Sequence, residues 1–405
     1  MSREFPRSIP ASAPLVLACA ILPLTLAGIQ AVLGRAPRLW AVEPAAWFAL
    51  AWLGALPVLR GARRSAARTI GAALVLGLGA VALFLYAGPA LRALSPSPAW
   101  LPELAPPAFL LLAWLWASTF GPPSRRAFLA WGGVLGLLRC LELGLNLAVL
   151  DRPPLASVLG CPDSLACVLV FCLCAALSAR GEDRPGRAGL WLFAILPGLA
   201  ACFSALALFT AGWCLLFFGP GRPRLRIPLF VLCLILTAGA LILPLDQHTV
   251  LTRLEQSRQW LAVFQALGES PGAWLAGLPL DRALPQDASP DLLSLLQAIG
   301  RAPAMRLSEL HAFWPRVIAS WGLPGPLLLL VLLAVPVLRR PTAFGAGAYA
   351  ACLSLGLTTP LFHSGNAAVV LVLALASASR VDSRDAADYD SNAPLVALDG
   401  RNAPE

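Results

Sequence analysis

Residues 245–268, LDQHTVLTRLEQSRQWLAVFQALG, open a long polar stretch that continues to Gly322. Most of the remaining chain consists of apolar runs of the length that a membrane-spanning helix needs. Hydrophobic residues make up 58% of the chain and charged residues 13%, whereas soluble domains average about 25% charged residues. The sequence therefore predicts a polytopic membrane protein, with this polar stretch as a large loop outside the membrane.

The expected fold is all-α, with about 12 transmembrane helices and short amphipathic helices in the periplasmic loop. This number requires the apolar run Leu190–Phe218 to form two spans joined as a tight hairpin near Phe203–Ala205, because the run is too long for one span. If both termini are cytoplasmic, nineteen arginines fall in the inside segments and four in the short outside loops, as the positive-inside rule requires. The predicted divisions are residues 1–245 with spans 1–9, the large loop 246–322, residues 323–379 with spans 10–12, and a disordered cytoplasmic tail 380–405.

Two segments of the large loop have helical periodicity. In Leu251–Leu267, the apolar positions fall on one broad face of a helix. The second segment is Arg306–Ile318, where apolar residues again recur at helical spacing. Both segments predict amphipathic helices outside the bundle of spans. The positions on the first face are Leu254, Trp260, Leu261, Val263, Phe264 and Leu267.

The composition also argues against several classes of function. The net charge of +9 is explained by the arginines that the positive-inside rule places in the cytoplasmic segments. It therefore does not indicate nucleic-acid binding. The ten cysteines lie within or beside apolar runs, where a cysteine behaves as a small hydrophobic residue. None of them has the spacing of a zinc site with histidine, and the outside segments contain no clustered carboxylates. We therefore expect no metal and no cofactor.

His311 is the candidate catalytic residue. A histidine at the boundary between membrane and water can accept or pass on a proton near neutral pH. The alternative is a surface histidine in a polar loop, and for a single histidine this alternative is the commoner one. His363, beside Asn366 at the mouth of the last predicted hairpin, is best interpreted as part of a polar turn.

Four arginines are candidates for binding a diphosphate: Arg139, Arg152, Arg253 and Arg258. Guanidinium groups bind phosphate oxygens through paired hydrogen bonds. Arg139 lies within a predicted span with Glu142 three residues later, so the two side chains share a helix face. Arg139 could face substrate or form a structural ion pair. The other three could equally contact solvent or lipid headgroups.

Three segments together resemble the O-antigen ligase and O-antigen polymerase family of bacterial envelope glycosyltransferases. GCPDSLACVLV (Gly160–Val170) is similar to that family's Gly-x-x-Pro-Asn-x-x-Ala segment. The segment Arg253–Leu280 resembles the family's arginine- and tryptophan-containing helix, which a Pro-x-x-Gly turn follows. HAFWPRVIASWGLPG (His311–Gly325) is similar to the His-Asn segment that leads into a Gly-Leu-x-Gly helix start.

The sequence also departs from the family's pattern at several positions. Asp163 and Ala312 each replace an asparagine, and Ser320 replaces an acidic residue. The family's Ser-Arg-Gly segment would fall near Phe203–Trp213, where this chain has no arginine. One phosphate contact that the family would have is therefore missing from the sequence.

The resemblance implies a GT-C-like enzyme of the bacterial inner membrane. It would transfer a glycan from an undecaprenyl-diphosphate carrier to a lipid or saccharide acceptor, such as lipid A core or a growing polysaccharide, without a metal. His311 would act on the acceptor hydroxyl, and the four arginines would bind the diphosphate. Membrane lipids would be further partners. The alternatives are a transporter or flippase for a lipid-linked substrate and a member of the family that has lost catalysis.

Overall fold

The computed structural model describes residues 8–21, 103, 105–148, 161–177, 185–219, 223–242, 247–279, 282–284, 305–307, 310–339 and 341–378. These residues are mostly helical, which confirms the expected all-α class. Within them, the only β-structure is one antiparallel pair of two-residue strands, β1 (Ala283–Leu284) and β2 (Met305–Arg306). The pair joins two parts of the large loop.

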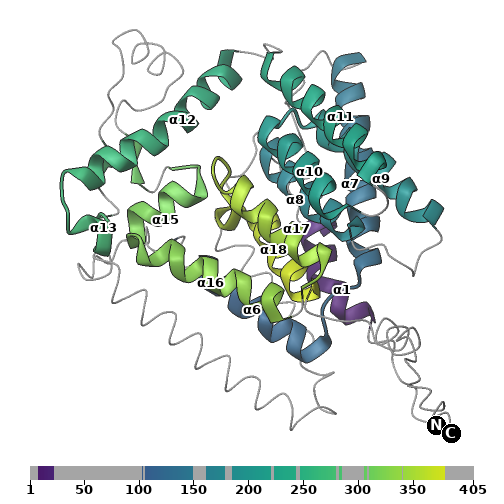
Figure 1. The fold of residues 1–405 in the computed structure, drawn as a ribbon, viewed down its shortest axis with the longest axis horizontal. Helices are drawn as coiled ribbons and strands as arrows, with labels where there is room; N and C mark the ends of the chain where they lie inside the picture. The colour runs from purple at the N-terminus through teal and green to yellow at the C-terminus, as the bar shows by residue number, and fades with distance from the viewer. Residues whose placement is uncertain are drawn as a thin grey trace, which may run out of the picture.

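Helices from both halves of the chain pack into one bundle (Figure 1). Segments that are far apart in sequence therefore lie side by side in the molecule. The bundle elements are α1 (Ser8–Val16), the π-helix η1 (Leu17–Ile21), α6 (Ala105–Phe120), α7 (Arg125–Ala148), α8 (Pro162–Ala176), α9 (Pro185–Ala201), α10 (Ala205–Phe218), α11 (Pro223–Ile242), α16 (Pro324–Arg339), α17 (Ala343–Leu355), the 3-10 turn η5 (Leu361–His363) and α18 (Gly365–Ala378).

Helices α8 and α18 form the centre of the bundle. Every residue of α8 from Leu165 to Ala176 is buried, and so is nearly all of α18 from Ala367 onward. A helix that is apolar on all sides is stable only when other elements surround it. Helix α8 is surrounded by α7, α9, α10 and α17 among others. Helix α18 packs against α6 and α17 as well.

Glycines allow α7 and α9 to approach closely. A Cβ atom added at Gly136 would overlap the carbonyl oxygen of Ala194, and one added at Gly198 would overlap the backbone of Gly136. Small residues at such a contact bring two helix backbones together and increase van der Waals packing. This close approach places α7 directly against the end of α9.

The apolar run Leu190–Phe218 is broken into two helices, as the sequence predicts. Helix α9 ends at Ala201 and α10 begins at Ala205, and Phe203 between them has a positive φ of 52°. The tight hairpin expected for this run is wrong, because each of the two helices packs mainly on another helix and not on the other one. Instead, α9 packs on α7 and α10 packs on α11, where Trp213 meets Phe230 edge to face.

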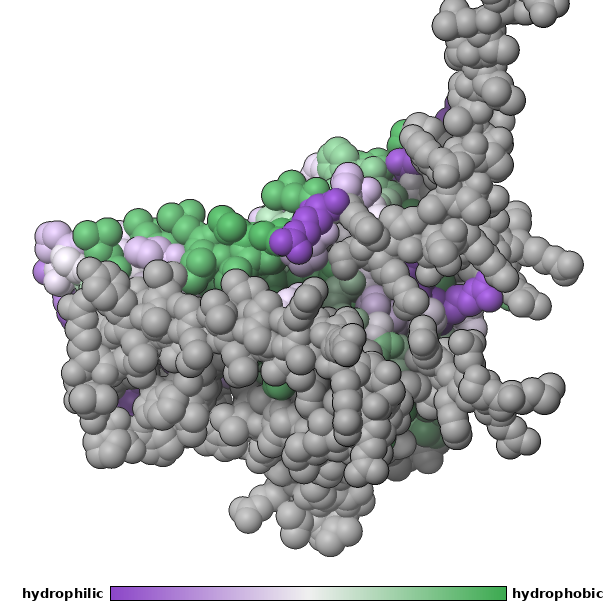
Figure 2. Space-filling view, turned by 90° about the horizontal axis from the view of Figure 1, so that it is seen from below, coloured by the Kyte–Doolittle hydropathy of each residue, from purple (hydrophilic) through white to green (hydrophobic). Residues whose placement is uncertain are grey.

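The bundle exposes many large apolar side chains on its outer surface. Leu141 on α7 and Ile235 on α11 are about 60% exposed, and hydrophobic residues form a band along one edge of the face in Figure 2. Among the described residues, α7 alone is long and apolar enough to cross a membrane by length and composition, and nine shorter helices are apolar.

The described residues of the large loop form three helices beside the bundle: α12 (Gln247–Gly268), α13 (Ala273–Ala276) and α15 (Phe313–Trp321). Helix α12 agrees with the periodicity predicted for Leu251–Leu267, but only part of its broad apolar face is covered. Val263 and Leu267 are buried against α15, whereas Leu261 and Phe264 remain exposed.

The helix expected over Arg306–Ile318 is also shorter than predicted. Met305 and Arg306 form β2, and α15 starts only at Phe313. Pro315 explains this start, because proline has no N–H to donate within a helix and is tolerated in the first turn. A helix that began at Arg306 would have placed Pro315 in its interior.

Several predicted features lie outside the described residues. They include Arg152 and the tail 380–405. The two spans predicted between residues 44 and 90 and the residues 285–304 of the large loop also lie outside the description. The backbone of Arg253 belongs to α12, but its side chain is outside the description.

Replacement of Gly136 by alanine should destabilise the protein by about 1–3 kcal/mol, because the added methyl group overlaps the backbone of α9. The control is Gly144→Ala on the same helix, where no atom lies within 4 Å of the new Cβ. Alanine is a better helix former than glycine by about 1 kcal/mol, so the control should be neutral or stabilising. Thermal unfolding in detergent, followed by tryptophan fluorescence, measures both, and equal melting temperatures would contradict the close contact.

Candidate functional site

His311 lies immediately before α15, and the backbone on both sides of it is held by buried side chains. The Ala312 N–H donates a hydrogen bond to Oε1 of Gln259 at 2.9 Å. On the other side, Nη1 of Arg316 donates to the Leu310 carbonyl oxygen at 3.4 Å. Gln259 and Arg316 are 1% and 7% exposed, whereas His311 is exposed. The histidine is thus presented at the surface from a backbone that is fixed at its two neighbours.

The start of α15 is further held by the loop that follows α17. The N–H of Phe313 donates to the Thr359 carbonyl oxygen at 3.1 Å, and that of Trp314 donates to the Gly356 carbonyl oxygen at 3.0 Å. The first N–H groups of a helix have no partner within the helix itself. Here α12 and the loop after α17 supply those partners, so α15 is capped by other parts of the fold.

Arg258 precedes Gln259 on α12, and its side chain is half-buried. Arg258 belongs to α12, and His311 lies just before α15. These two helices pack against each other, so the helix of Arg258 lies beside the helix that follows His311. Arg253 lies on α12 one and a half turns before Arg258. The predicted role of these two arginines in binding a diphosphate stays a prediction.

Arg139 lies elsewhere. It is completely buried on α7, its Nη1 donates to Oε2 of Glu142 at 2.8 Å, and its Nε donates to the Ala201 carbonyl oxygen at 3.2 Å. The ion pair expected from the spacing is confirmed. Helix α7 and helix α15 lie on opposite sides of the molecule in Figure 1. The structure therefore does not bring Arg139 to His311, and its contacts favour the structural ion pair over a substrate-facing role.

The contacts of Arg139 place a guanidinium at the turn between α9 and α10. The sequence of this turn and of α10 has no arginine where the resemblance expects one. An arginine is nevertheless present at the turn, supplied by α7. Its burial means that it stabilises the end of α9, as its bond to Ala201 shows.

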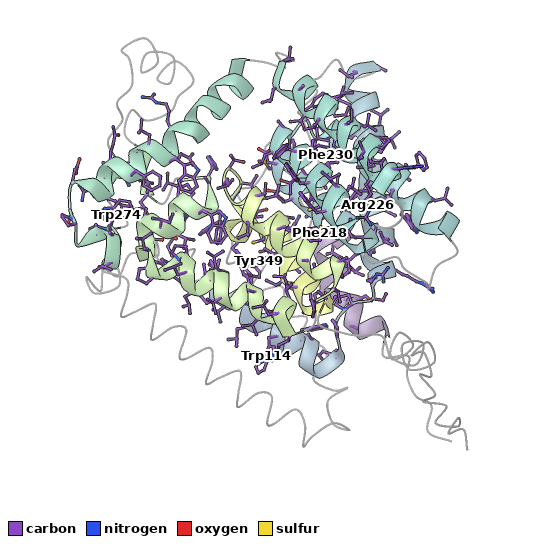
Figure 3. The ribbon with its side chains drawn as sticks, viewed as in Figure 1. Trp114, Phe218, Arg226, Phe230, Trp274 and Tyr349 are labelled. Atoms are coloured by element: carbon purple, nitrogen blue, oxygen red, sulfur yellow. The ribbon has the colours of Figure 1, made fainter. Side chains whose placement is uncertain are left out.

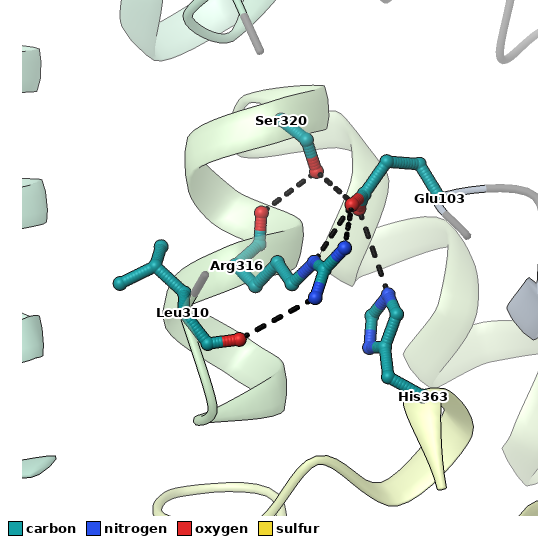
Figure 4. A network of polar contacts seen from close by, with 5 residues as sticks. All are labelled: Glu103, Leu310, Arg316, Ser320 and His363. Atoms are coloured by element: carbon teal, nitrogen blue, oxygen red, sulfur yellow. Dashed lines mark hydrogen bonds and ion pairs between the residues drawn. The ribbon is translucent and has the colours of Figure 1, made fainter. Parts of the chain in front are cut away.

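A buried polar network that the sequence did not reveal lies under the His311 segment (Figure 4). The guanidinium of Arg316 binds the carboxylate of Glu103 through Nε at 2.7 Å and also through Nη2. Ser320 Oγ lies 3.3 Å from Oε2 of Glu103 and 2.7 Å from the Arg316 carbonyl oxygen. Nε2 of His363 lies 3.6 Å from Oε2 of Glu103, which is too long for a hydrogen bond. Three separate segments therefore meet at one carboxylate.

The charges of this network shift the pKa values of its members. Burial alone would raise the pKa of Glu103, but the guanidinium of Arg316 and then His363 outweigh it and lower the pKa to about 2. Burial, followed by the Arg316 charge, lowers the pKa of His363 below its ordinary value, against the opposite effect of Glu103. At neutral pH the network is thus an ion pair between Glu103 and Arg316 beside a neutral imidazole.

One signal in the sequence could have revealed this network. Arg316 occurs in FWPRVIASW, where every neighbour is apolar or small. A buried guanidinium requires a carboxylate partner, so an acidic residue had to lie opposite. Nothing local identifies Glu103 as that residue, because 213 positions separate the two. His363 was expected to be a turn residue, and it does lie in the turn η5, but its side chain is turned into the protein.

No group of three or more metal-ligating side chains occurs within the described part of the chain. The ten cysteines are all free, and most are buried in the bundle.

No protein-family model and no curated protein matches this sequence. The candidate site therefore depends on its own geometry and on the resemblance of its motifs.

Glu103→Gln should destabilise the protein at pH 7 by about 3–5 kcal/mol, because Arg316 is left as a buried charge without a carboxylate. The double variant Glu103→Gln/Arg316→Met should be more stable than this single variant, because it removes the unpaired charge as well. Thermal unfolding of the two single variants and the double variant completes a thermodynamic cycle. Additive losses would contradict the ion pair.

The same pair predicts a dependence on pH. The lowered pKa of Glu103 means that its ion pair stabilises the folded state above the ordinary pKa of 4.5, and that this stabilisation disappears as the pH falls toward about 2. The stability of the wild type should therefore approach that of Glu103→Gln between these two values. A difference that stays constant down to pH 2 would show that the carboxylate is not the group that titrates.

Proposed function

We propose that this chain is a polytopic enzyme of the bacterial inner membrane, with both termini in the cytoplasm. It transfers a glycan from an undecaprenyl-diphosphate carrier to a lipid or saccharide acceptor at the periplasmic face. The observation that carries this proposal is the exposed His311 on a backbone fixed by Gln259 and Arg316. A catalytic base is most effective when its support is rigid, because the reacting groups then need no rearrangement.

The apolar exterior of the bundle supports a place in the membrane. Leucine, isoleucine and phenylalanine side chains lie exposed on α7, α9, α11 and α16. Contiguous exposed apolar surface of this kind is rare on a soluble monomer and is favourable against lipid. The distribution of arginines supports the orientation that leaves the large loop in the periplasm.

The proposed reaction requires few groups. The acceptor hydroxyl attacks the anomeric carbon of the first sugar, and its proton passes to His311. The bond between that carbon and the diphosphate oxygen breaks, so that a new glycosidic bond forms and undecaprenyl diphosphate leaves. Arg258, with Arg253 on the same helix, would offset the charge of the leaving diphosphate. Arg139 is not part of this mechanism, because its contacts are within the bundle.

His311→Ala should reduce glycan transfer roughly 100-fold to 10,000-fold, the range that general base catalysis contributes. The test uses purified protein with a lipid-linked donor, and a gel separates the products by size. Gly144→Ala is the control, because no described atom of another element lies within 4 Å of a Cβ atom added at this position. Unchanged transfer by His311→Ala at normal membrane levels would reject His311 as the base. Transport of the lipid-linked donor across vesicles without any transfer would instead support a flippase.

Gln259→Met should slow transfer about 10-fold while the protein remains folded, because methionine has a similar shape but no oxygen to accept the Ala312 N–H. Gln259→Glu retains an oxygen at this place and should lose less activity. The measurement is the rate constant of transfer at saturating donor, together with the melting temperature. Equal rates for the two variants would show that the bond to Ala312 does not position His311.

A further inference from the structure

A group of apolar side chains on α12, α13 and the start of α16 has no described element packed over it. Leu261 is 54% exposed, Phe264 43%, Leu275 69% and Leu323 42%. We call these four residues, with the half-buried rings of Trp260 and Trp274, the apolar shelf. Trp274 marks its position on α13 in Figure 3.

The members of the apolar shelf form one continuous surface. The ring of Phe264 stacks between those of Trp260 and Trp274, at centroid distances of 5.6 and 5.9 Å. The N–H of Leu323 donates to the Trp274 carbonyl oxygen at 2.8 Å, so the start of α16 is attached directly to α13. The surface therefore extends without a break from α12 across α13 to α16.

The exposure of this surface is not a consequence of packing within the loop. Helix α12 uses one part of its apolar arc, with Val263 and Leu267, to pack against α15. An ordinary amphipathic helix has polar residues beyond the part that is covered. In α12 the arc continues to Phe264 and Leu261, each one turn from its apolar neighbour, and both remain exposed.

The apolar shelf continues into the outer stripe of α16. Leu323, Leu327 and Val331 follow one another at intervals of four residues and are 42%, 61% and 61% exposed. In the proposed function α16 crosses the membrane, so this stripe faces lipid. The same apolar surface then extends past the outer end of α16 onto α13 and α12.

The residues around the apolar shelf are those that occur at a membrane boundary. Tryptophan is enriched at the level of the lipid headgroups, and the shelf contains Trp260 and Trp274, of which Trp260 donates its indole N–H to the Leu357 carbonyl oxygen at 2.9 Å. Arg258 lies one turn before Leu261 on α12, and a long side chain at this position can reach headgroup phosphates. The ion pair between Glu269 and Arg282 lies beyond the end of α12 and is partly exposed.

We propose that the apolar shelf lies in the outer leaflet, at the depth of the headgroups and the adjoining acyl carbons, and that bilayer lipid covers it. Helix α12 then lies along the membrane surface and does not extend into the periplasm. This inference rests on the proposed function and adds to it. Arg258 is held at the depth of lipid phosphates, so the diphosphate of a carrier lipid reaches it without leaving the bilayer.

The test measures the surroundings of spin labels on single cysteines. The labels replace Leu261 and Leu275 on the apolar shelf, Val331 on α16 as the lipid control, and Ala283 on β1 as the water control, since Ala283 is exposed in the same loop. The background carries Cys140→Ser and Cys161→Ser, because these are the native cysteines that are not fully buried. The full chain is placed in nanodiscs of phosphatidylethanolamine and phosphatidylglycerol. Collisions with molecular oxygen, which concentrates in lipid, and with a water-soluble nickel chelate are then compared.

We expect the labels at Leu261 and Leu275 to favour oxygen several-fold over the nickel chelate, as Val331 does, and the label at Ala283 to favour the chelate. If Leu261 and Leu275 resemble Ala283 while Val331 reports lipid, the inference fails and the proposed function stands. If both reagents are excluded from the two shelf labels, protein covers the shelf, and the inference fails as well. If Val331 also reports water, the membrane placement fails together with the inference.

Discussion

The ion pair between Arg316 and Glu103 is the interaction on which the surroundings of His311 depend. A guanidinium in the middle of an apolar helix is costly to bury unless a carboxylate meets it, and Glu103 does so by accepting hydrogen bonds from two nitrogens of Arg316, Nε and Nη2. The pair ties the segment before α6 to α15, and the neutral imidazole of His363 on η5 lies beside it without a hydrogen bond. With Nε and Nη2 occupied by Glu103, Arg316 still holds the carbonyl next to His311 through Nη1. One electrostatic requirement thus ties two distant segments together and helps to hold the backbone beside the candidate catalytic residue.

Part of the fold follows from the sequence and part does not. The length of Leu190–Phe218 predicts a break, and the structure has one at Cys202–Ser204, because span length is a local property of the chain. The choice of neighbours for α9 and α10 is not local, and it depends on glycines such as Gly136 and Gly198 that meet from separate helices. The apolar spacing predicts too early a start for α15, because that spacing continues back to Arg306 whereas Pro315 is tolerated only in the first turn of a helix.

The same division applies to the candidate site. The motif His311–Gly325 identifies His311 from sequence, and the structure presents that residue at the surface of the protein. The side chains that hold its backbone could not be predicted, because Gln259 is 53 positions away from Ala312, whose N–H donates a hydrogen bond to it. Arg139 shows the opposite case. Its pairing with Glu142 was predicted from helical spacing, but only the fold shows that α7 lies away from α12 and α15.

The distance in sequence between Glu103 and Arg316 also has a consequence for how the protein is made. A ribosome adds Glu103 early, and 213 further residues must follow before its partner exists. During that time the carboxylate lacks the guanidinium that it binds in the folded protein. The contact between Glu103 and α15 can therefore form only after α15 has been synthesised. A chain that stops before residue 316 lacks this ion pair altogether, however well its earlier helices pack.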